Sequence, residues 1–222
     1  MSEEKTLTLE TIDLCQSGLH SLTLKVAQGE IFGILGPRGA GKTAVFNLLS
    51  GKSSPTGGTL RILGRDFWRH ERELRRLVGA CASPQHDINT PGLEYTAREH
   101  LNFEAGLIGF SHQKYRDRID EVLAFVGLTA YDNLLVAAFP GDMRRRLALA
   151  RALLTKPQLV IIDEPTAGVA EEKCELIWKL LRDLRDEGKT IVLTTSSWQE
   201  VQEVCDRVAQ LCEGELQDIM AP

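Results

Sequence analysis

The sequence lacks the features that mark membrane-spanning, secreted and metal-binding chains. No apolar run approaches the length of a membrane span, because Arg, Lys or Asp interrupts each long run within a few residues. Residues 1–5 do not carry the basic and apolar pattern of a signal peptide. The 5 cysteines form no C-x-x-C pair and no metal-like spacing: Cys15, Cys81, Cys174, Cys205 and Cys212. We therefore expect a soluble cytoplasmic chain with reduced thiols, in which any membrane role comes through a partner.

The chain also lacks a surplus of positive charge. It has 26 Lys and Arg against 31 Asp and Glu, a formal net charge of -5. This balance predicts no nucleic-acid partner. Hydrophobic residues make up 43% of the 222 positions, enough for a sizeable core. We expect one α/β domain with a small inserted subdomain.

One glycine-rich stretch, at 36–43, matches the pattern G-x-x-x-x-G-K-[ST] between an expected strand at 30–35 and an expected helix from residue 44. Its glycines let successive backbone N–H groups point at a phosphate chain, and the helix N-terminus adds partial positive charge. Lys42 would reach the β- and γ-phosphates, and the Thr43 hydroxyl would bind Mg²⁺. The alternative is a tight strand-to-helix turn without a ligand. The predicted nucleotide-binding residues are Gly36, Pro37, Arg38, Gly39, Ala40, Gly41, Lys42 and Thr43.

Two carboxylates follow a second buried strand, expected at 158–162. Asp163 stands at the carboxyl end of that strand, where it could hold Mg²⁺ beside the phosphate loop. Glu164 could polarise an attacking water molecule. The alternative is a solvated strand end, which the nearby phosphate loop makes the weaker interpretation.

Hydrophobic periodicity predicts alternating strands and helices, which is typical of a parallel sheet covered on both faces. Helix-spaced apolar residues dominate between about 84 and 140, which indicates a helical insert. Trp178 has helical spacing with Leu181, which predicts a core position. Further strands are expected at 7–14, 19–26, 59–63, 77–82 and 190–195, with a hairpin at 208–219. Further helices are expected at 71–76, 96–107, 111–125, 142–154, 170–187 and 197–205.

Three further motifs carry a resemblance to a known family. Residues 78–85 resemble a Q-loop that ends in Gln85, and residues 139–147 stand where the family has its signature sequence. Asp163 and Glu164 match the Mg²⁺ aspartate and the catalytic glutamate of the same family. Together with the loop at 36–43, these motifs make the chain similar, over essentially its whole length, to the ATP-binding subunits of ABC transporters. Drug- and polysaccharide-exporter ATPases are the most similar type.

The resemblance implies a P-loop NTPase fold of the ABC type: a parallel core sheet, an antiparallel β subdomain and an inserted helical subdomain. It implies one domain over 1–222, with the core at 1–85 and 141–222 and the helical subdomain at 86–140. ATP and Mg²⁺ are the implied cofactors, and the implied catalytic residues are Lys42, Gln85 and Glu164. Thr43, Gln85 and Asp163 are the implied metal ligands. The implied partners are an integral membrane permease and a second ATP-binding subunit, at the cytoplasmic face of the inner membrane.

Four positions depart from the family pattern. Pro140 replaces the signature serine, Asp142 its second glycine, Ala170 the D-loop aspartate and Ser196 the switch histidine. No aromatic residue lies within 7–30, where the family stacks adenine. Pro140 offers neither a hydroxyl nor an N–H. At ~4 Å and an effective dielectric of about 20, Asp142 would repel a phosphate by on the order of 4 kcal/mol per unit charge before relaxation.

These departures predict slow hydrolysis by the chain alone and favour a heterodimer with a more complete partner. A non-hydrolysing regulatory subunit is the main alternative. A soluble ATPase with no permease is a third, although the chain has no coiled-coil insert or second ATPase domain. Phe103, Leu107 and Phe110 are expected either in the core of the helical subdomain or in a groove for the permease.

Overall fold

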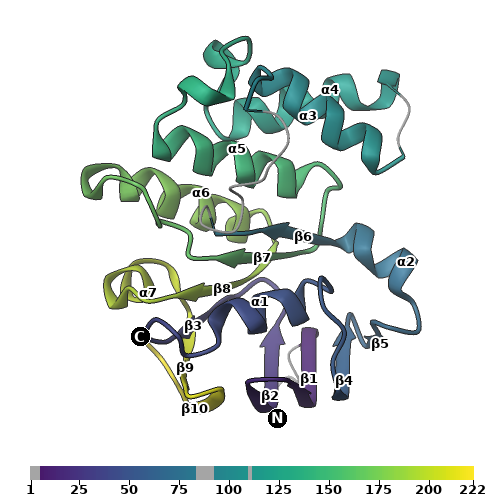
Figure 1. Cartoon of the computed structure of the whole chain (residues 1–222), viewed down its shortest axis with the longest axis vertical. Coiled ribbons are helices and arrows are strands. Elements are labelled where there is room, and N and C mark those ends of the chain that lie inside the picture. The colour runs from purple at the N-terminus through teal and green to yellow at the C-terminus, as the bar shows by residue number, and fades with distance from the viewer. Residues whose placement is uncertain (1–5, 84–92, 110–111) are drawn as a thin grey trace.

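A computed structural model describes residues 6–83, 93–109 and 112–222. It contains a four-stranded sheet and a six-stranded sheet, with helices packed against the latter (Figure 1). The α/β class predicted from the alternation of strands and helices is confirmed.

The four-stranded sheet is antiparallel and has the order β2-β1-β4-β5. Its strands are β1 (Leu7–Gln16), β2 (Leu19–Ala27), β4 (Gly57–Ile62) and β5 (Arg65–Asp66). Gln16 pairs with Leu19 across the short turn between β1 and β2. The short strand β5 is a correction, because it is not among the strands expected from the sequence. Gly64 does turn the chain, with φ 74°, but Arg65 and Asp66 then pair back onto β4.

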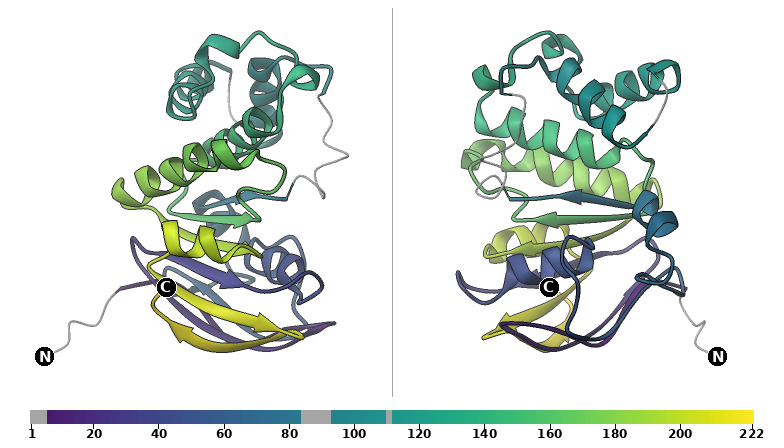
Figure 2. Two further views of the ribbon diagram at one scale, coloured as in Figure 1. Left: turned by 90° about the vertical axis from the view of Figure 1, so that its left-hand side faces the viewer. Right: turned by 45° about the vertical axis from the view of Figure 1, so that its right-hand side comes forward.

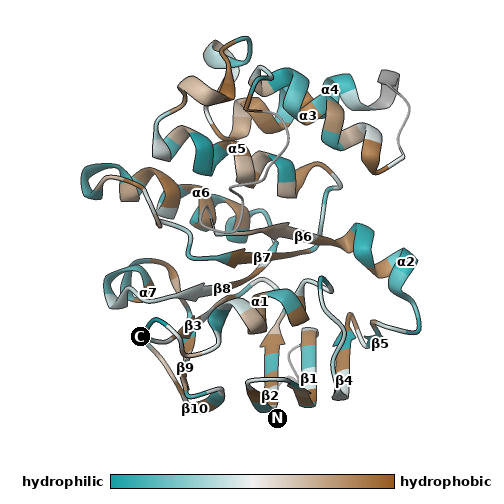
Figure 3. Ribbon diagram, in the orientation of Figure 1, coloured by the Kyte–Doolittle hydropathy of each residue, from teal (hydrophilic) through white to brown (hydrophobic). Residues whose placement is uncertain are grey.

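The six-stranded sheet has the order β10-β9-β3-β8-β7-β6. Five of its strands run parallel to their neighbours, and β10 joins β9 as an antiparallel hairpin. Its strands are β3 (Ile31–Leu35), β6 (Val78–Cys81), β7 (Leu159–Asp163), β8 (Thr190–Thr195), β9 (Arg207–Cys212) and β10 (Glu215–Met220). β7 and β8 are buried at every position, which is typical of parallel strands covered on both faces (β7 is largely brown in Figure 3).

Successive residues of β7 enter two different hydrophobic clusters. Leu159 and Ile161 pack with residues of the four-stranded sheet and of α1 (Lys42–Leu49). Val160 and Ile162 pack with residues of the helices α3 to α6 on the other face. Figures 1 and 2 show α3 to α6 on one side of the six-stranded sheet, and α1 with the four-stranded sheet on the other side. The remaining helices are α2 (Glu71–Leu74), α3 (Ala97–Leu107), α4 (His112–Phe125), α5 (Gly141–Leu153), α6 (Cys174–Asp186) and α7 (Trp198–Val204), with short 3-10 turns at Arg75–Leu77, Thr129–Tyr131, Val136–Ala138 and Glu171–Lys173.

The helices α3 and α4 form the outermost layer of the molecule. The Thr96 side chain and the Glu99 side chain cap the start of α3 reciprocally. Gly127, at φ 67°, follows the end of α4, which is typical of a glycine that ends a helix. Ser111, a plausible N-cap for the helix expected at 111–125, lies outside the described residues. The division of the chain at 86–140 stays a prediction.

Two of the three apolar residues left open in the sequence are not core residues. Phe103 is 42% exposed and Leu107 is 69% exposed, both on α3. Phe110 lies outside the described residues. Within 6–83, 93–109 and 112–222, no helix has the length and apolar character needed to span a bilayer.

Candidate functional site

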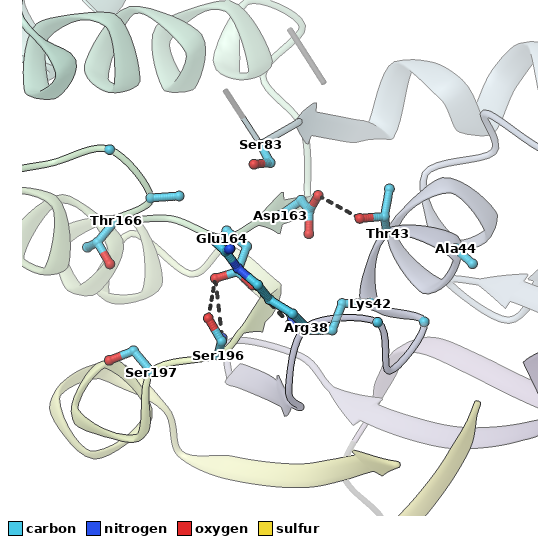
Figure 4. A pocket seen from close by; sticks show the side chains of 14 residues that line it. Arg38, Lys42, Thr43, Ala44, Ser83, Asp163, Glu164, Thr166, Ser196 and Ser197 are labelled. Carbon is cyan, nitrogen blue, oxygen red and sulfur yellow. Dashed lines mark hydrogen bonds and ion pairs between the residues drawn. The ribbon is translucent and has the colours of Figure 1, made fainter. Parts of the chain in front are cut away.

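The carboxyl ends of the parallel strands β3, β7 and β8 open onto a cavity of about 680 Å³ (Figure 4). Ligands of open parallel sheets bind outside this edge. Residues of four segments far apart in the sequence line the cavity: Arg38, Gly39, Gly41, Lys42, Thr43, Ala44, Ser83, Asp163, Glu164, Thr166, Ala167, Gly168, Ser196 and Ser197. The structure therefore brings the predicted phosphate loop and both predicted carboxylates together. Gln85, predicted as a catalytic and metal-binding residue, lies outside the described residues.

The phosphate loop owes its shape to two left-handed glycines. Gly39 has φ 83° and Gly41 has φ 102°, conformations that other residues rarely adopt. Gly41 is the N-cap of α1, so Lys42 and Thr43 begin that helix beside the cavity. The helix N-terminus therefore contributes partial positive charge where the predicted phosphates would lie.

The turn between β9 and β10 supports the loop from behind. The Gly214 N–H donates to the Ala40 carbonyl at 3.1 Å, and its carbonyl accepts from the His20 N–H at 2.9 Å. A Cβ built on Gly214 would lie 2.4 Å from the Gly18 carbonyl oxygen. The β9–β10 turn is therefore wedged between the phosphate loop and the β1–β2 turn.

Lys42 is a buried cation, with 7% exposure. Its ammonium donates to the carbonyl oxygens of Gly36 at 2.7 Å and Pro37 at 2.9 Å. It also lies 3.2 Å from Oε1 of Glu164. These oxygens hold the lysine side chain folded back over the loop, with its charge balanced by Glu164. Gly36, Pro37 and Ala40 do not line the cavity and take part through backbone contacts.

Asp163 is buried at the end of β7, with 1% exposure. Its Oδ1 accepts a hydrogen bond from Thr194 Oγ1 at 2.5 Å, and its Oδ2 lies 3.5 Å from Thr43 Oγ1. A carboxylate and a hydroxyl oxygen suit Mg²⁺, which proteins commonly hold through one or two side chains plus substrate phosphates. The described residues contain no group of three or more His, Cys, Asp or Glu that could hold a metal without such help. The donor set therefore fits Mg²⁺ bound together with a nucleotide.

Glu164 faces the same cavity from an unusual backbone conformation, with φ 49°. Its Oε1 contacts Lys42, and its Oε2 accepts hydrogen bonds from both the N–H and the Oγ–H of Ser196, each at 3.2 Å. Ser196 was identified from the sequence only as the residue in place of a histidine. The structure adds that Ser196 fixes the free oxygen of Glu164.

The segment that departs most from the family pattern begins α5. Pro140 is its N-cap, and a Cβ on Gly141 would lie 2.1 Å from the Gly168 carbonyl oxygen. Asp142 is 5% exposed, yet it accepts from Lys173 at 2.9 Å and from Arg146 at 3.1 Å. Burial opposes its charge, but these hydrogen bonds hold the pKa of Asp142 below its ordinary value. Asp142 therefore keeps its negative charge, and the structure adds that Lys173 and Arg146 balance it.

Sequence reasoning missed a buried arginine that ties α5 to the site. Arg145 is 3% exposed, and its guanidinium donates to the carbonyl oxygens of Asp163 at 2.6 Å and Pro165 at 2.8 Å, and to that of Ala82. The three consecutive arginines at 144–146 were interpreted only as part of the signature segment at 139–147. The spacing of Arg145 with the buried Leu149 was a signal that could have identified it.

Comparison with known proteins identifies a matching family and similar relatives. The family model described as ABC transporter matches residues 19–167. Over 196 residues the chain is 39% identical to Nod factor export ATP-binding protein I of Rhizobium sp. (strain N33), covering 88% of this chain and 63% of the relative. The protein of the same name from Paraburkholderia xenovorans (strain LB400) is 40% identical over the same 88% and 63%. The chain thus spans less than two thirds of these relatives.

Solved structures show the same fold. The structure of cbiO1 from Clostridium perfringens, part of the ABC transporter complex cbiONQ, superposes with a TM-score of 0.86 at 24% identity, over 98% of this chain and 90% of that one. An ATP-binding cassette of an ABC transporter in its ADP conformation gives 0.83 at 20% identity, over 97% and 91%.

Proposed function

The chain belongs to the ABC transporter family, and from that premise we propose that it is an ATP-binding subunit that couples ATP binding and hydrolysis to transport by a separate membrane permease. One observation carries the proposal: Lys42, Thr43, Asp163 and Glu164 meet in one cavity at the carboxyl edge of the sheet. The relatives named for Nod factor export support export as the direction of transport.

Each residue has a distinct role in the proposed reaction. Lys42 and the loop N–H groups bind and orient the β- and γ-phosphates. Thr43 and Asp163 would hold Mg²⁺, with Gln85 as a further proposed ligand; the bound ion neutralises charge on the phosphates. Glu164 orients a water molecule in line with the γ-phosphate. Lys42 and Glu164 lie 3.2 Å apart, so a phosphate that binds the Lys42 ammonium competes with the Glu164 carboxylate for it. The carboxylate released in this way can accept a hydrogen bond from the water molecule.

Binding and hydrolysis by the purified chain test this assignment. Lys42→Ala should weaken MgATP binding by at least about tenfold, because it removes a buried charge-assisted contact. Glu164→Gln should bind MgATP normally and lose about a hundredfold or more of the hydrolysis rate. Glu203→Gln, at an exposed position of α7, is the matched control. Hydrolysis that survives Glu164→Gln would contradict the proposed role of this carboxylate.

We also propose that the permease docks on the face of α3 that carries Phe103 and Leu107. Both side chains are large, apolar and exposed, which is typical of a surface covered by a partner. Co-purification with an integral membrane protein should be lost in Phe103→Ser with Leu107→Ser, while MgATP binding is kept. Leu176→Ser on α6, 48% exposed in the native chain, is the matched control. Equal recovery of the membrane protein by both variants would exclude this face of α3 as the docking surface for the permease.

Slow hydrolysis by the chain alone is a further part of the proposal, together with a second ATP-binding subunit that completes the site. Pro140 lacks the hydroxyl and the N–H of a signature serine, and Ser196 lacks the charge of an imidazole. Pro140→Ser with Ser196→His should therefore raise turnover by about tenfold or more. Fast turnover by the native chain would overturn this part. ATP binding without phosphate release, even with the permease present, would favour the alternative of a non-hydrolysing regulatory subunit. The departures from the family pattern at Pro140 and Ala170 are also compatible with that alternative.

A further inference from the structure

A fully buried carboxyl lies behind the candidate site, and no step described so far uses it. Glu200, in the first turn of α7, has 0% exposure. Its Oε1 accepts a hydrogen bond from the indole N–H of Trp178 on α6 at 3.3 Å. Its own N–H donates to Ser197 Oγ at 3.2 Å. A glutamate is almost never completely buried without a specific reason.

The contacts of Glu200 lead to both residues that face the reacting atoms. The hydroxyls of Thr195, which precedes Ser196, and of Thr166, which follows Glu164 by two positions, lie near its carboxyl, whose Oε2 has no hydrogen-bond partner among the described residues. Thr195 Oγ1 in turn accepts from the Ser197 N–H at 3.0 Å. Glu200 thus contacts the residues that follow β7, the end of β8 and the middle of α6. A single side chain joins the two segments that bring Glu164 and Ser196 together.

The surroundings of Glu200 favour a neutral carboxylic acid. Among the described residues, Glu200 forms no ion pair with a cation. The titratable groups that face it are Glu164 beyond β7, Cys174 at the start of α6 and Cys205 after α7. Burial raises the pKa of Glu200, and the charge of Glu164 raises it further, against the opposing effect of the Trp178 hydrogen bond and of the nearby Thr195 and Thr166 hydroxyls. A protonated carboxyl can donate as well as accept, which a carboxylate cannot.

We propose that Glu200 is a positioning residue for hydrolysis: its buried carboxyl holds the ends of β7 and β8 against α6 and so fixes Glu164 and Ser196 relative to each other. The inference rests on the proposed ATPase function. A glutamine has the same shape and the same mixture of donor and acceptor as a protonated glutamate, so it should replace Glu200. An alanine should not.

The kinetic test compares Glu200→Gln with Glu200→Ala, and Glu203→Ala, exposed on the same helix, serves as the control. Glu200→Ala should lower kcat by about tenfold and leave KM for MgATP within about twofold, because orientation of the water is lost while the phosphate contacts stay. Glu200→Gln should keep kcat within about twofold. An equal loss in both variants would show that a charged carboxylate is required and overturn the proposal. So would an unchanged kcat in Glu200→Ala.

A second measurement keeps the test independent of turnover. Hydrogen exchange at the amides of Ser196 and Ser197 should be about tenfold faster in Glu200→Ala and unchanged in Glu200→Gln, because these N–H groups donate to Glu164 and Thr195. If Glu200→Ala does not fold, Trp178→Phe removes the indole donor and should speed the same amides by about threefold. A native chain without ATPase activity would contradict the proposed function alone, whereas unchanged exchange in these variants would contradict the role of Glu200.

Discussion

Glu164 illustrates how much one backbone torsion determines at this site. A left-handed conformation costs a non-glycine residue roughly 1–2 kcal/mol. Here φ is 49°, and the conformation is held by the Glu164 N–H, which donates to the Thr194 carbonyl at 2.8 Å, and by the side-chain contacts with Lys42 and Ser196. Backbone strain of this kind is common at functional sites, where a side chain must point in a particular direction.

The protonation of Glu200 has a consequence for stability that does not involve ATP. Because the folded-state pKa is raised above the ordinary value of 4.5, the unfolded chain releases this proton at a lower pH than the folded chain does. The stability of the native chain relative to Glu200→Gln should therefore fall as the pH rises above 4.5, until the raised pKa is passed. Urea unfolding of both proteins between about pH 5 and pH 8 measures this difference. A difference that does not change with pH would mean that Glu200 is charged in the folded state.

The sequence predicted the residues of the site that belong to continuous motifs. Lys42, Thr43, Asp163 and Glu164 were found because a phosphate loop and a strand that ends in carboxylates have local patterns. The contact of Asp142 with Lys173 and that of Glu200 with Trp178 were not found. Each joins segments that are far apart along the chain, 31 positions for Asp142 and Lys173 and 22 for Glu200 and Trp178. No local pattern indicates such pairs.

At the scale of elements, the start of α5 is closely fitted against the segment that follows Glu164. Gly141 is the first residue of α5, and the Gly168 carbonyl occupies the space where its side chain would be. Arg145 reinforces the same contact through the carbonyls of Asp163 and Pro165. The helix therefore cannot slide relative to the site without breaking these bonds.

Two glycine substitutions separate this fit from helix propensity. Gly141→Ala should destabilise the chain by about 1–3 kcal/mol, because the new Cβ would lie 2.1 Å from a backbone oxygen. Gly106→Ala, in α3 with nothing within 4 Å of the added Cβ, should instead stabilise it by about 0.5–1 kcal/mol. Thermal or urea unfolding of the two variants gives the comparison. If Gly141→Ala were as stable as the native chain, α5 and the 164–168 segment would not be as tightly packed as described.

Element types followed from periodicity more reliably than element ends did. The long strands and helices have patterns that repeat several times, so their existence was predictable. The helix expected from residue 170 begins instead as the 3-10 turn Glu171–Lys173 and becomes α6 at Cys174. Lys173 lies at that junction and donates to Asp142, a tertiary contact that the local pattern does not contain. The short β5 was missed because two residues carry no periodicity.

At the scale of the whole molecule, the six-stranded sheet contributes residues to two hydrophobic clusters, one on each of its faces. Leu101 of α3 and Ile119 of α4 belong to the same cluster as Val160 and Ile191 of the sheet. Each buried side chain of this size contributes about 1.5–3 kcal/mol. The outer helices pack against each other and against α5, which contacts β6, so their stabilisation depends on the rest of the core.

This dependence predicts that residues 93–140 do not fold alone. The isolated fragment should show weak helical circular dichroism and no cooperative urea transition, because the faces of Leu101 and Ile119 lose the side chains that bury them. The full chain should unfold in one transition. A cooperative transition of the fragment would show that the helical segment is an independent domain.

The β9–β10 turn, wedged against the phosphate loop through Gly214 and Ala40, has a practical meaning for experiments on this protein. The turn is a poor site for inserted tags or linkers, since any lengthening would push on the loop. For the same reason the turn is a suitable position for a fluorescent reporter. A dye at the exposed Glu213 sits one residue from a hydrogen bond to the loop, so its emission would register changes in the loop without a label inside the cavity.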